Sequence, residues 1–177
     1  MSKIGRKPIS VQDLEVTLEG QTVRYKGSKD SGTYELPDCL SVKLENNFLI
    51  LEMADSQDKK NKKFWGMHRA LLANELAGAK QEFSTDVVIV GLGYKGELKG
   101  NFIEFSLGYS HKINFDLPEG VKVEIDKSGQ KLKVSSSDKF LMGDVAQRIC
   151  ALRRPEPYKG TGVRLQTQQI LRKVGKS

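Results

Sequence analysis

Short runs of alternating apolar and polar residues recur along most of the chain. Residues 14–19 read LEVTLE and residues 121–126 read VKVEID, so every second side chain is apolar in both. This period of two is typical of a strand that has one face on a core and one face in water. Short polar turns, LENNF at 44–48 and DKSGQ at 126–130, follow such runs and favour antiparallel hairpins over longer crossovers.

Two segments have the wider spacing of an amphipathic helix. In the second half of the chain, apolar residues recur at intervals of four, four and three, and Ser137 or Asp138 can cap the start of the predicted helix. In the first half a broader stripe ends near Gly78, which we expect to stop the helix. We expect Trp65 and Phe64, at the start of that first helix, to belong to the core. The two stripes are Leu141, Val145, Ile149 and Leu152, and Met67, Leu71, Leu72 and Leu76.

The two halves of the chain resemble each other. LPDCLSVKLE at 36–45 aligns with LPEGVKVEID at 117–126, and GQTVRYKG at 20–27 aligns with GNFIEFSL at 100–107. The nearly constant offset indicates an internal duplication. We therefore predict an α+β fold with two similar tandem domains, each an antiparallel sheet with one packed helix, and an extended basic C-terminal tail. The predicted boundaries are residues 1–82, 83–152 and 153–177, with the tail packing against the second domain.

Composition limits the class of protein. The 177 residues contain no run of about 18 apolar residues that would span a membrane, and MSKIGRKPIS lacks the apolar stretch of a secretory signal. Cys39 and Cys150 are isolated, which argues against a zinc site or a disulfide framework and favours a reducing, cytoplasmic compartment.

The stretch VVIVGLGYKGEL at 87–98 fits the dinucleotide-binding pattern G-x-G-x-x-G, and Asp116 falls where a ribose-binding acid is expected. A dinucleotide site also needs a helix after the glycines, so that free amides face the phosphates. Residues 102–107 alternate like a strand instead. We therefore interpret Gly91, Gly93 and Gly96 as residues that allow positive φ angles and close backbone approach in a long hairpin loop. Tyr94 and Lys95 would lie near the tip of this loop.

Catalytic patterns are absent from the sequence. His68 and His111 fall in different copies without a nearby Asp-His-Ser arrangement, and Glu124 and Asp126 lie on what we expect to be the wet face of a strand. No H-E-x-x-H, Walker or G-x-S-x-G motif occurs. We expect a protein without catalytic activity, cofactor or metal.

Positive charge is concentrated at the C-terminal end. Residues 139–177 hold nine Lys or Arg and two acidic residues, which accounts for the whole net charge of +7. Within this region PEPYKGTGVR at 155–164 combines two prolines that stiffen the chain with two glycines that let backbone amides approach an anion. Cations, an aromatic ring and close backbone approach are what RNA binding requires, although a solubilising tail has a similar composition. The cations and the ring around this frame are Arg153, Arg154, Tyr158, Lys159 and Arg164, and Arg172 and Lys173 follow.

The string PEPYKGTGVR also resembles the C-terminal signature of the large-subunit ribosomal protein six family, in its bacterial form. The resemblance extends over nearly the whole chain and includes SKIGRKPI at 2–9, RALL at 69–72, GLGYKGELKGN at 91–101 and LGYSH at 107–111. It implies a structural component of the large ribosomal subunit, cytoplasmic and active in translation. Its partners would be large-subunit rRNA near the stalk base and the factor-binding region, and neighbouring ribosomal proteins.

The resemblance also implies RNA contacts at particular positions. The signature residues are the strongest candidates, the glycine loop and the N-terminus weaker ones. The family commonly has Lys where this chain has Thr161 and often Arg where it has Lys95, so two contacts are expected to be weaker here. The residues carried over are Tyr158, Lys159, Gly160, Gly162 and Arg164, then Tyr94 and Lys95, and finally Lys3, Arg6 and Lys7.

Two other classes of function remain open from the residues alone. The first is an enzyme that binds a nucleotide through the Gly91–Gly96 loop. The second is a protein-interaction adaptor built from two similar domains, in which RNA has no part.

Overall fold

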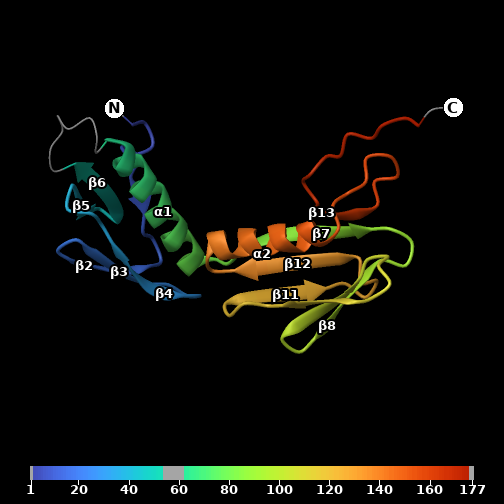
Figure 1. Ribbon diagram of the computed structural model, residues 1–177. Coiled ribbons are helices and arrows are strands. Elements are labelled where there is room, and N and C mark those ends of the chain that lie inside the picture. Colours follow the sequence, from blue (N-terminus) through green and yellow to red (C-terminus); the bar gives the residue numbers. More distant parts are fainter. Residues whose placement is uncertain (1, 54–61, 176–177) are drawn as a thin grey trace. The chain divides into compact units, whose positions relative to one another are not determined.

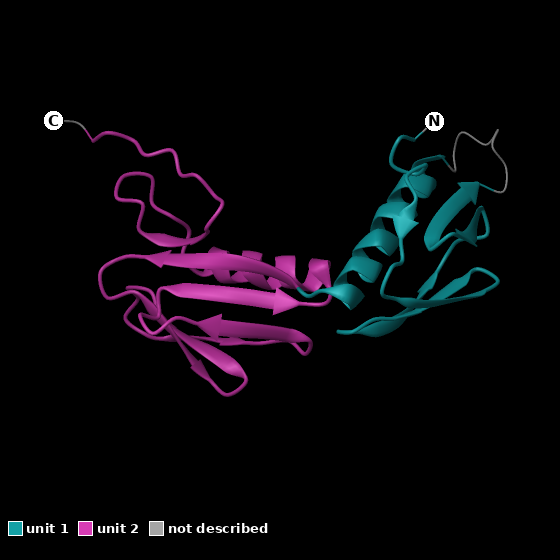
Figure 2. Ribbon diagram, turned by 180° about the vertical axis from the view of Figure 1, so that it is seen from behind, with its two compact units in different colours: residues 1–82 teal, residues 83–177 magenta. Residues whose placement is uncertain are grey.

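The computed structural model describes residues 2–53 and 62–175. It divides into two compact units, Met1–Glu82 and Phe83–Ser177 (Figure 2). Each unit repeats one order of elements: a first strand, a three-stranded meander, a hairpin and a helix. This repetition confirms the predicted α+β fold with two similar domains.

Unit 1 contains two antiparallel three-stranded sheets and one helix (Figure 1). One sheet has the order β2-β3-β4 and the other β1-β6-β5. Helix α1 and the buried sides of both sheets share one core, which includes Leu72, Leu76, Leu49 and Val23. The elements are β1 (Ile9–Ser10), β2 (Glu15–Glu19), β3 (Thr22–Lys26), β4 (Ser31–Glu35), β5 (Leu40–Glu45), β6 (Phe48–Met53) and α1 (Lys62–Lys80).

Unit 2 repeats this plan and adds one strand from the tail. Its three-stranded sheet has the order β10-β9-β8, and its larger sheet has the order β11-β12-β7-β13, all antiparallel. Helix α2 lies along the larger sheet (Figure 1), and Val145 and Ile149 of α2 are fully buried against it. The elements are β7 (Phe83–Val90), β8 (Lys95–Lys99), β9 (Phe102–Ser106), β10 (Ile113–Asp116), β11 (Val121–Ile125), β12 (Lys131–Ser136), α2 (Lys139–Leu152) and β13 (Gly162–Leu165).

The predicted second helix is confirmed, including its cap. Asp138 has extended backbone angles and its Oδ1 accepts a hydrogen bond from the Phe140 amide at 2.7 Å. This bond satisfies one of the amides that a helix start leaves without a partner. Asp138, and not Ser137, is therefore the capping residue.

The prediction for the first helix is wrong in two respects. Gly78 does not stop α1, which continues to Lys80. The backbone reason is that the Lys29 amide donates to the Ala79 carbonyl at 3.0 Å, while the Ser28 hydroxyl donates to the Lys80 carbonyl at 3.0 Å. These donors, from the β3–β4 turn, satisfy the last carbonyls of the helix and extend it by two residues beyond the glycine.

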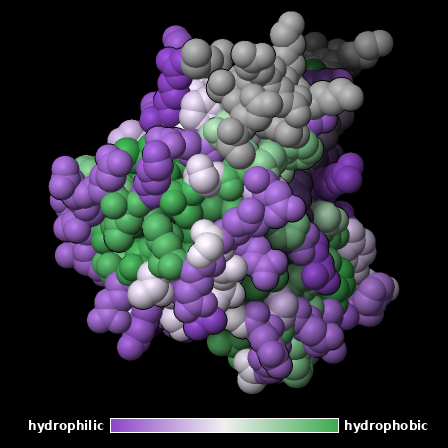
Figure 3. Space-filling view, turned by 90° about the vertical axis from the view of Figure 1, so that its left-hand side faces the viewer, coloured by the Kyte–Doolittle hydropathy of each residue, from purple (hydrophilic) through white to green (hydrophobic). Residues whose placement is uncertain are grey.

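The second error concerns the buried stripe of α1. Trp65 is buried as predicted and its Nε1 donates to the Leu51 carbonyl at 2.9 Å, but Phe64, Met67 and Leu71 are exposed. The core-facing stripe runs through Trp65, Leu72 and Leu76. Figure 3, which views the left-hand side of Figure 1, shows an area of hydrophobic residues bordered by hydrophilic ones.

Candidate nucleic-acid interface

The basic tail is folded onto unit 2 and is extended only in part. Residues Gly162–Leu165 form β13, an edge strand that pairs antiparallel with β7, and Val163 is fully buried opposite Ile89. The Val163 amide donates to the Arg153 carbonyl at 2.8 Å, so the strand also binds the chain that leaves α2. Burial of Val163 and the strand pairing therefore fix part of the predicted extended tail against unit 2.

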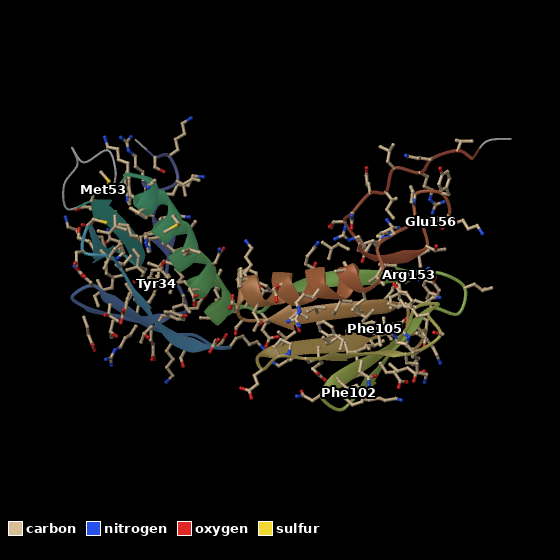
Figure 4. The ribbon with its side chains drawn as sticks, viewed as in Figure 1. Tyr34, Met53, Phe102, Phe105, Arg153 and Glu156 are labelled. Carbon is tan, nitrogen blue, oxygen red and sulfur yellow. The ribbon has the colours of Figure 1, made fainter. Side chains whose placement is uncertain are left out.

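A compact loop at residues 156–161, here called the signature loop, projects between α2 and β13. Its ends are closed because the Glu156 amide donates to the Thr161 carbonyl and the Gly160 amide donates to the Glu156 carbonyl, both at 2.9 Å. Figure 4 marks Glu156 on this projecting part of the chain. Tyr158 is 54% exposed and Lys159 is exposed as well. The loop thus presents an aromatic ring and a cation at adjacent positions.

Glycine is required just after the loop because the chain doubles back on itself. A Cβ at Gly162 would lie 2.7 Å from the Pro155 Cα, and Gly162 has φ of +146°. Gly160 has φ of +73°. Both conformations are unfavourable for a residue with a side chain. The two glycines act by shaping the loop, since both are buried.

The last described residues return to the signature loop and add charge to it. The Lys173 amide donates to the Pro157 carbonyl at 2.9 Å. The Arg172 guanidinium packs against Gly160, where an added Cβ would lie 3.1 Å from its Nε. Arg172 and Lys173 are exposed. The fold therefore places Lys159, Arg172 and Lys173 within one loop structure, although Arg172 and Lys173 lie more than ten residues further along the chain. Lys176, another cation of the tail, lies outside the described residues.

The remaining cations of the tail differ from one another. Arg164 is half-buried, and one of its terminal nitrogens donates to the Gln168 carbonyl at 2.8 Å. Its buried Nε has no hydrogen-bond partner among the described residues. Arg154 is exposed beside a hollow that Gln147 and Gln168 also line. Arg164 thus supports the turn after β13, whereas Arg154 offers its charge to solvent.

Arg153, labelled in Figure 4, belongs to a cluster that the sequence did not reveal. Its guanidinium carbon lies 4.6 Å from the centre of the Tyr109 ring. The Tyr109 and His111 rings are stacked, with centroids 6.0 Å apart and planes 25° apart. Tyr109 and His111 are exposed. The available signal was the string LGYSH, in which an aromatic residue follows a glycine in a loop.

The glycine-rich segment after β7 is not a nucleotide site. Residues 95–99 and 102–106 form strands β8 and β9, so no helix follows the glycines. Gly91 and Gly108 instead leave room for the Tyr94 ring, since a Cβ at either position would lie 2.6 Å from that ring or its hydroxyl. Among the described residues no group of three or more His, Cys, Asp or Glu could hold a metal ion.

Tyr94 and Lys95 do not lie at the loop tip as predicted. Tyr94 is partly buried against the core of unit 2, and Lys95 begins β8. Lys95 Nζ lies 2.6 Å from a Glu97 carboxylate oxygen, and its hydrogen bond lowers the pKa of Glu97 below the ordinary value. The tip is occupied by the fully exposed Leu92. The position of Tyr94 depends on its packing against distant residues. The alternation of apolar and polar residues along one strand does not predict such packing.

The three N-terminal candidates belong to unit 1, whereas the tail belongs to unit 2. Lys3, Arg6 and Lys7 are exposed, and the Lys7 carbonyl accepts a hydrogen bond from Arg69 Nε at 3.0 Å. Nearby, Gly5 packs closely against the Trp65 ring, which anchors this segment to the core. The N-terminal cations are thus on an ordered stretch of backbone.

Possible catalytic groups have structural roles. His68 Nδ1 and the Tyr34 hydroxyl form a hydrogen bond of 2.8 Å within unit 1. Burial raises the pKa of the Cys150 thiol, which lowers its reactivity as a nucleophile.

In the described parts of the chain no helix is both long and apolar enough to cross a membrane.

Known proteins resemble this chain along its full length. The Ribosomal protein L6 family model matches residues 90–165, which include the signature loop and the segment with Tyr109 and His111. The large ribosomal subunit protein uL6 of Campylobacter jejuni is 39% identical over 178 residues, which cover 100% of this chain and 98% of that protein. Those of Borrelia garinii and Bartonella henselae are 39% and 43% identical, and cover 100% and 99% of this chain and 98% and 99% of the respective protein.

These relatives are named as ribosomal proteins, in agreement with the prediction of a chain without catalytic activity. Their coverage includes both units and the tail, so the resemblance is not limited to one domain. The chain belongs to the ribosomal protein L6 family.

Proposed function

We propose that this chain is a structural protein of the large ribosomal subunit and binds large-subunit rRNA through unit 2 and its tail. It acts in the cytoplasm, within the ribosome, and supports translation near the stalk base and the factor-binding region. Residues 153–177 form the main docking segment. The observation that carries the proposal is the signature loop, where Tyr158 and Lys159 are exposed and Arg172 and Lys173 fold back against the loop.

This arrangement suits a phosphate backbone. Exposed cations on a closed, hydrogen-bonded loop keep a fixed spacing, so little freedom is lost when the loop binds. Double-stranded RNA hides its base edges in a deep groove and is recognised mainly through shape and phosphates. The N-terminal Lys3, Arg6 and Lys7 supply a second, smaller set of cations on unit 1.

Two differences from the family pattern have distinct consequences. The Thr161 hydroxyl donates to a Glu156 carboxylate oxygen at 3.3 Å, so this position contributes to loop closure in place of a cation. Lys95 is paired with Glu97 at the start of β8. We propose that neither residue is a principal RNA contact here.

Salt-dependent binding tests the proposal. The affinity of the full chain for large-subunit rRNA, measured by filter binding, should fall about a thousandfold or more from about 50 to about 200 mM salt. Changing Lys159 and Arg172 together to Ala should weaken binding and reduce the slope of log affinity against log salt by about two. Lys26 and Lys29, exposed in unit 1, provide the control pair. An affinity that does not depend on salt, or an equal effect of both pairs, would contradict the proposal.

A further inference from the structure

Three planar side chains are stacked on unit 2, two of them exposed and the third, Arg153, partly buried. The Arg153 guanidinium lies over the Tyr109 ring, and the Tyr109 ring is stacked with the His111 imidazole. Tyr109 is 43% exposed and His111 is exposed, so ring surface is open to solvent.

The stack is held in place from two sides. The Tyr109 hydroxyl donates to the Leu152 carbonyl at the end of α2, at 3.1 Å, which ties the loop to the helix from which Arg153 emerges. Beneath the loop, Gly108 has φ of +76° and lies directly on Tyr94, where an added Cβ would come within 2.6 Å of the Tyr94 hydroxyl. The rings are therefore oriented before any ligand arrives, which reduces the entropy lost on binding.

The position of the stack relates it to the tail. Arg153 is the first residue after α2, and its carbonyl accepts the hydrogen bond from Val163 that anchors β13. Lys112 is the next residue after His111, and its Nζ lies 2.7 Å from a Glu104 carboxylate oxygen. Arg153 thus belongs to the segment that leads into the signature loop, whereas Tyr109 and His111 lie between β9 and β10.

We propose that Arg153, Tyr109 and His111 form a stacking platform for an unpaired nucleobase of RNA. This inference rests on the proposed RNA-binding function and adds a site to it. Unpaired bases are recognised by stacking on aromatic side chains and guanidinium planes, because a base in a helix has no free face. The platform supplies both kinds of surface, and Arg153 adds attraction through its charge. The signature loop contacts phosphates, whereas the platform contacts a base.

Substitutions at His111 separate stacking from charge. His111→Ala removes ring surface, whereas His111→Phe keeps a ring and removes any possible positive charge. The probes are a short oligoadenylate and a sugar–phosphate backbone of the same length that lacks bases. Binding of each probe to the full chain is measured by fluorescence anisotropy. Lys159→Ala serves as the matched variant that removes a cation from the signature loop.

The platform predicts a specific set of results. His111→Ala should weaken oligoadenylate binding about fivefold or more, whereas His111→Phe should retain affinity within about twofold. Neither change should alter binding of the backbone without bases, and the salt dependence should be unchanged. Lys159→Ala should weaken binding of both probes and reduce the salt dependence.

Other outcomes overturn the platform in distinguishable ways. Equal losses for His111→Ala and His111→Phe, on both probes, would mean that His111 contacts a phosphate as a cation. An effect of Lys159→Ala without any effect of His111→Ala would remove the platform and leave the proposed RNA binding intact. Absence of oligoadenylate binding to the unaltered chain would overturn the platform, whereas the proposed rRNA binding is overturned by a salt-independent affinity for large-subunit rRNA.

Discussion

The first strands of the two units have different surroundings. In unit 1, β1 has two residues and pairs with β6, and Arg69 from α1 donates to the Lys7 and Pro8 carbonyls just before it, each at 3.0 Å. In unit 2, β7 has eight residues and pairs on one side with β12 and on the other with β13. One arginine side chain covers backbone groups in the first case, and a strand of the tail covers them in the second.

This difference relates the shared fold of the two units to the RNA binding proposed for unit 2. Sheet edges with unpaired amides and carbonyls invite unwanted pairing, so they need a cover. In unit 2 the strand that pairs with this edge, β13, directly follows the signature loop. The cations proposed to bind RNA are therefore attached to an element that also stabilises the sheet. In unit 1 a single side chain, Arg69, binds the backbone at the corresponding place. The shared frame thus accounts for the fold, and the added segment accounts for the proposed binding.

Core substitutions in unit 1 are expected to cause the largest loss of stability, confined to that unit. The rRNA binding proposed for unit 2 should be retained. Leu72→Ala should destabilise unit 1 by about 2–5 kcal/mol, because Leu72 is fully buried and its loss leaves a cavity. Met67→Ala, at an exposed position of the same helix, is the control. Fluorescence of Trp65, the single tryptophan, reports unit 1 during denaturant unfolding. Loss of rRNA affinity under conditions where unit 2 stays folded would show that the two units are not separable in function.

Removing the cover of β7 should destabilise unit 2 by a smaller amount. Gly162→Val should cost about 2–3 kcal/mol, because the new side chain meets the Pro155 backbone and φ is +146°. Gly143→Ala is the control, since Gly143 lies within α2 with open space around the added carbon and should stabilise the helix by up to about 1 kcal/mol. Hydrogen exchange of the β7 amides provides the measurement. Unchanged protection of Val88 and Val90 in Gly162→Val would mean that β13 does not cover this edge.

The arginine cover of unit 1 should contribute less. Arg69→Met should lower the stability of unit 1 by about 1 kcal/mol, because two carbonyl groups lose their charged donor at a solvent-exposed site. Arg24→Met, which removes an exposed ion pair with Glu19, should change stability by less than about 0.5 kcal/mol. Denaturant midpoints followed through Trp65 compare the two. Equal midpoints would contradict the role given to Arg69.

The smallest effect is expected for the acid stability of the β8–β10 sheet. Hydrogen bonds from Lys112 and then Lys99 hold the pKa of Glu104 below its ordinary value of 4.5. The folded state therefore gains stability from this group above its unfolded pKa and loses it as pH falls through the lower, folded value. In Glu104→Gln this part of the pH dependence should be absent. If the unfolding midpoints of the unaltered chain and of Glu104→Gln change equally from neutral to acidic pH, the stabilising role given to the Glu104 carboxylate is wrong.

The sequence predicted those features that depend on local pattern. The strand alternation of 121–126 and the helix cap at Ser137 or Asp138 each depend on a few neighbouring residues, and the structure has a strand at Val121–Ile125 and a cap at Asp138. The duplication is visible because two such local patterns recur about 80 residues apart. The G-x-G-x-x-G string was rejected correctly for a local reason as well, since the residues after it alternate like a strand. The helix that a dinucleotide needs is replaced by β8 and β9.

The features that the sequence did not predict depend on contacts between distant residues. Tyr94 turned inward because Gly91 and Gly108 together make space for its ring, and Gly108 is in another strand connection. The end of α1 extends past Gly78 because donors from the β3–β4 turn reach its carbonyls. The stack on Tyr109 joins a loop near residue 110 to the end of α2. Contacts of this kind depend on how distant segments fold together, so they leave no periodic pattern in the sequence.

We expect the cations of the folded tail to supply the main attachment of the chain to the large subunit, and exposed cations of unit 1 outside the N-terminal set to contribute little. Co-sedimentation with large subunits in a sucrose gradient at low salt compares Lys159→Glu/Lys173→Glu with Lys26→Glu/Lys29→Glu, two charge reversals of equal size at exposed positions. The tail variant should be mostly lost from the subunit peak, and the unit 1 variant should remain in it. Equal retention of both variants, or loss of the unit 1 variant alone, would contradict this expectation.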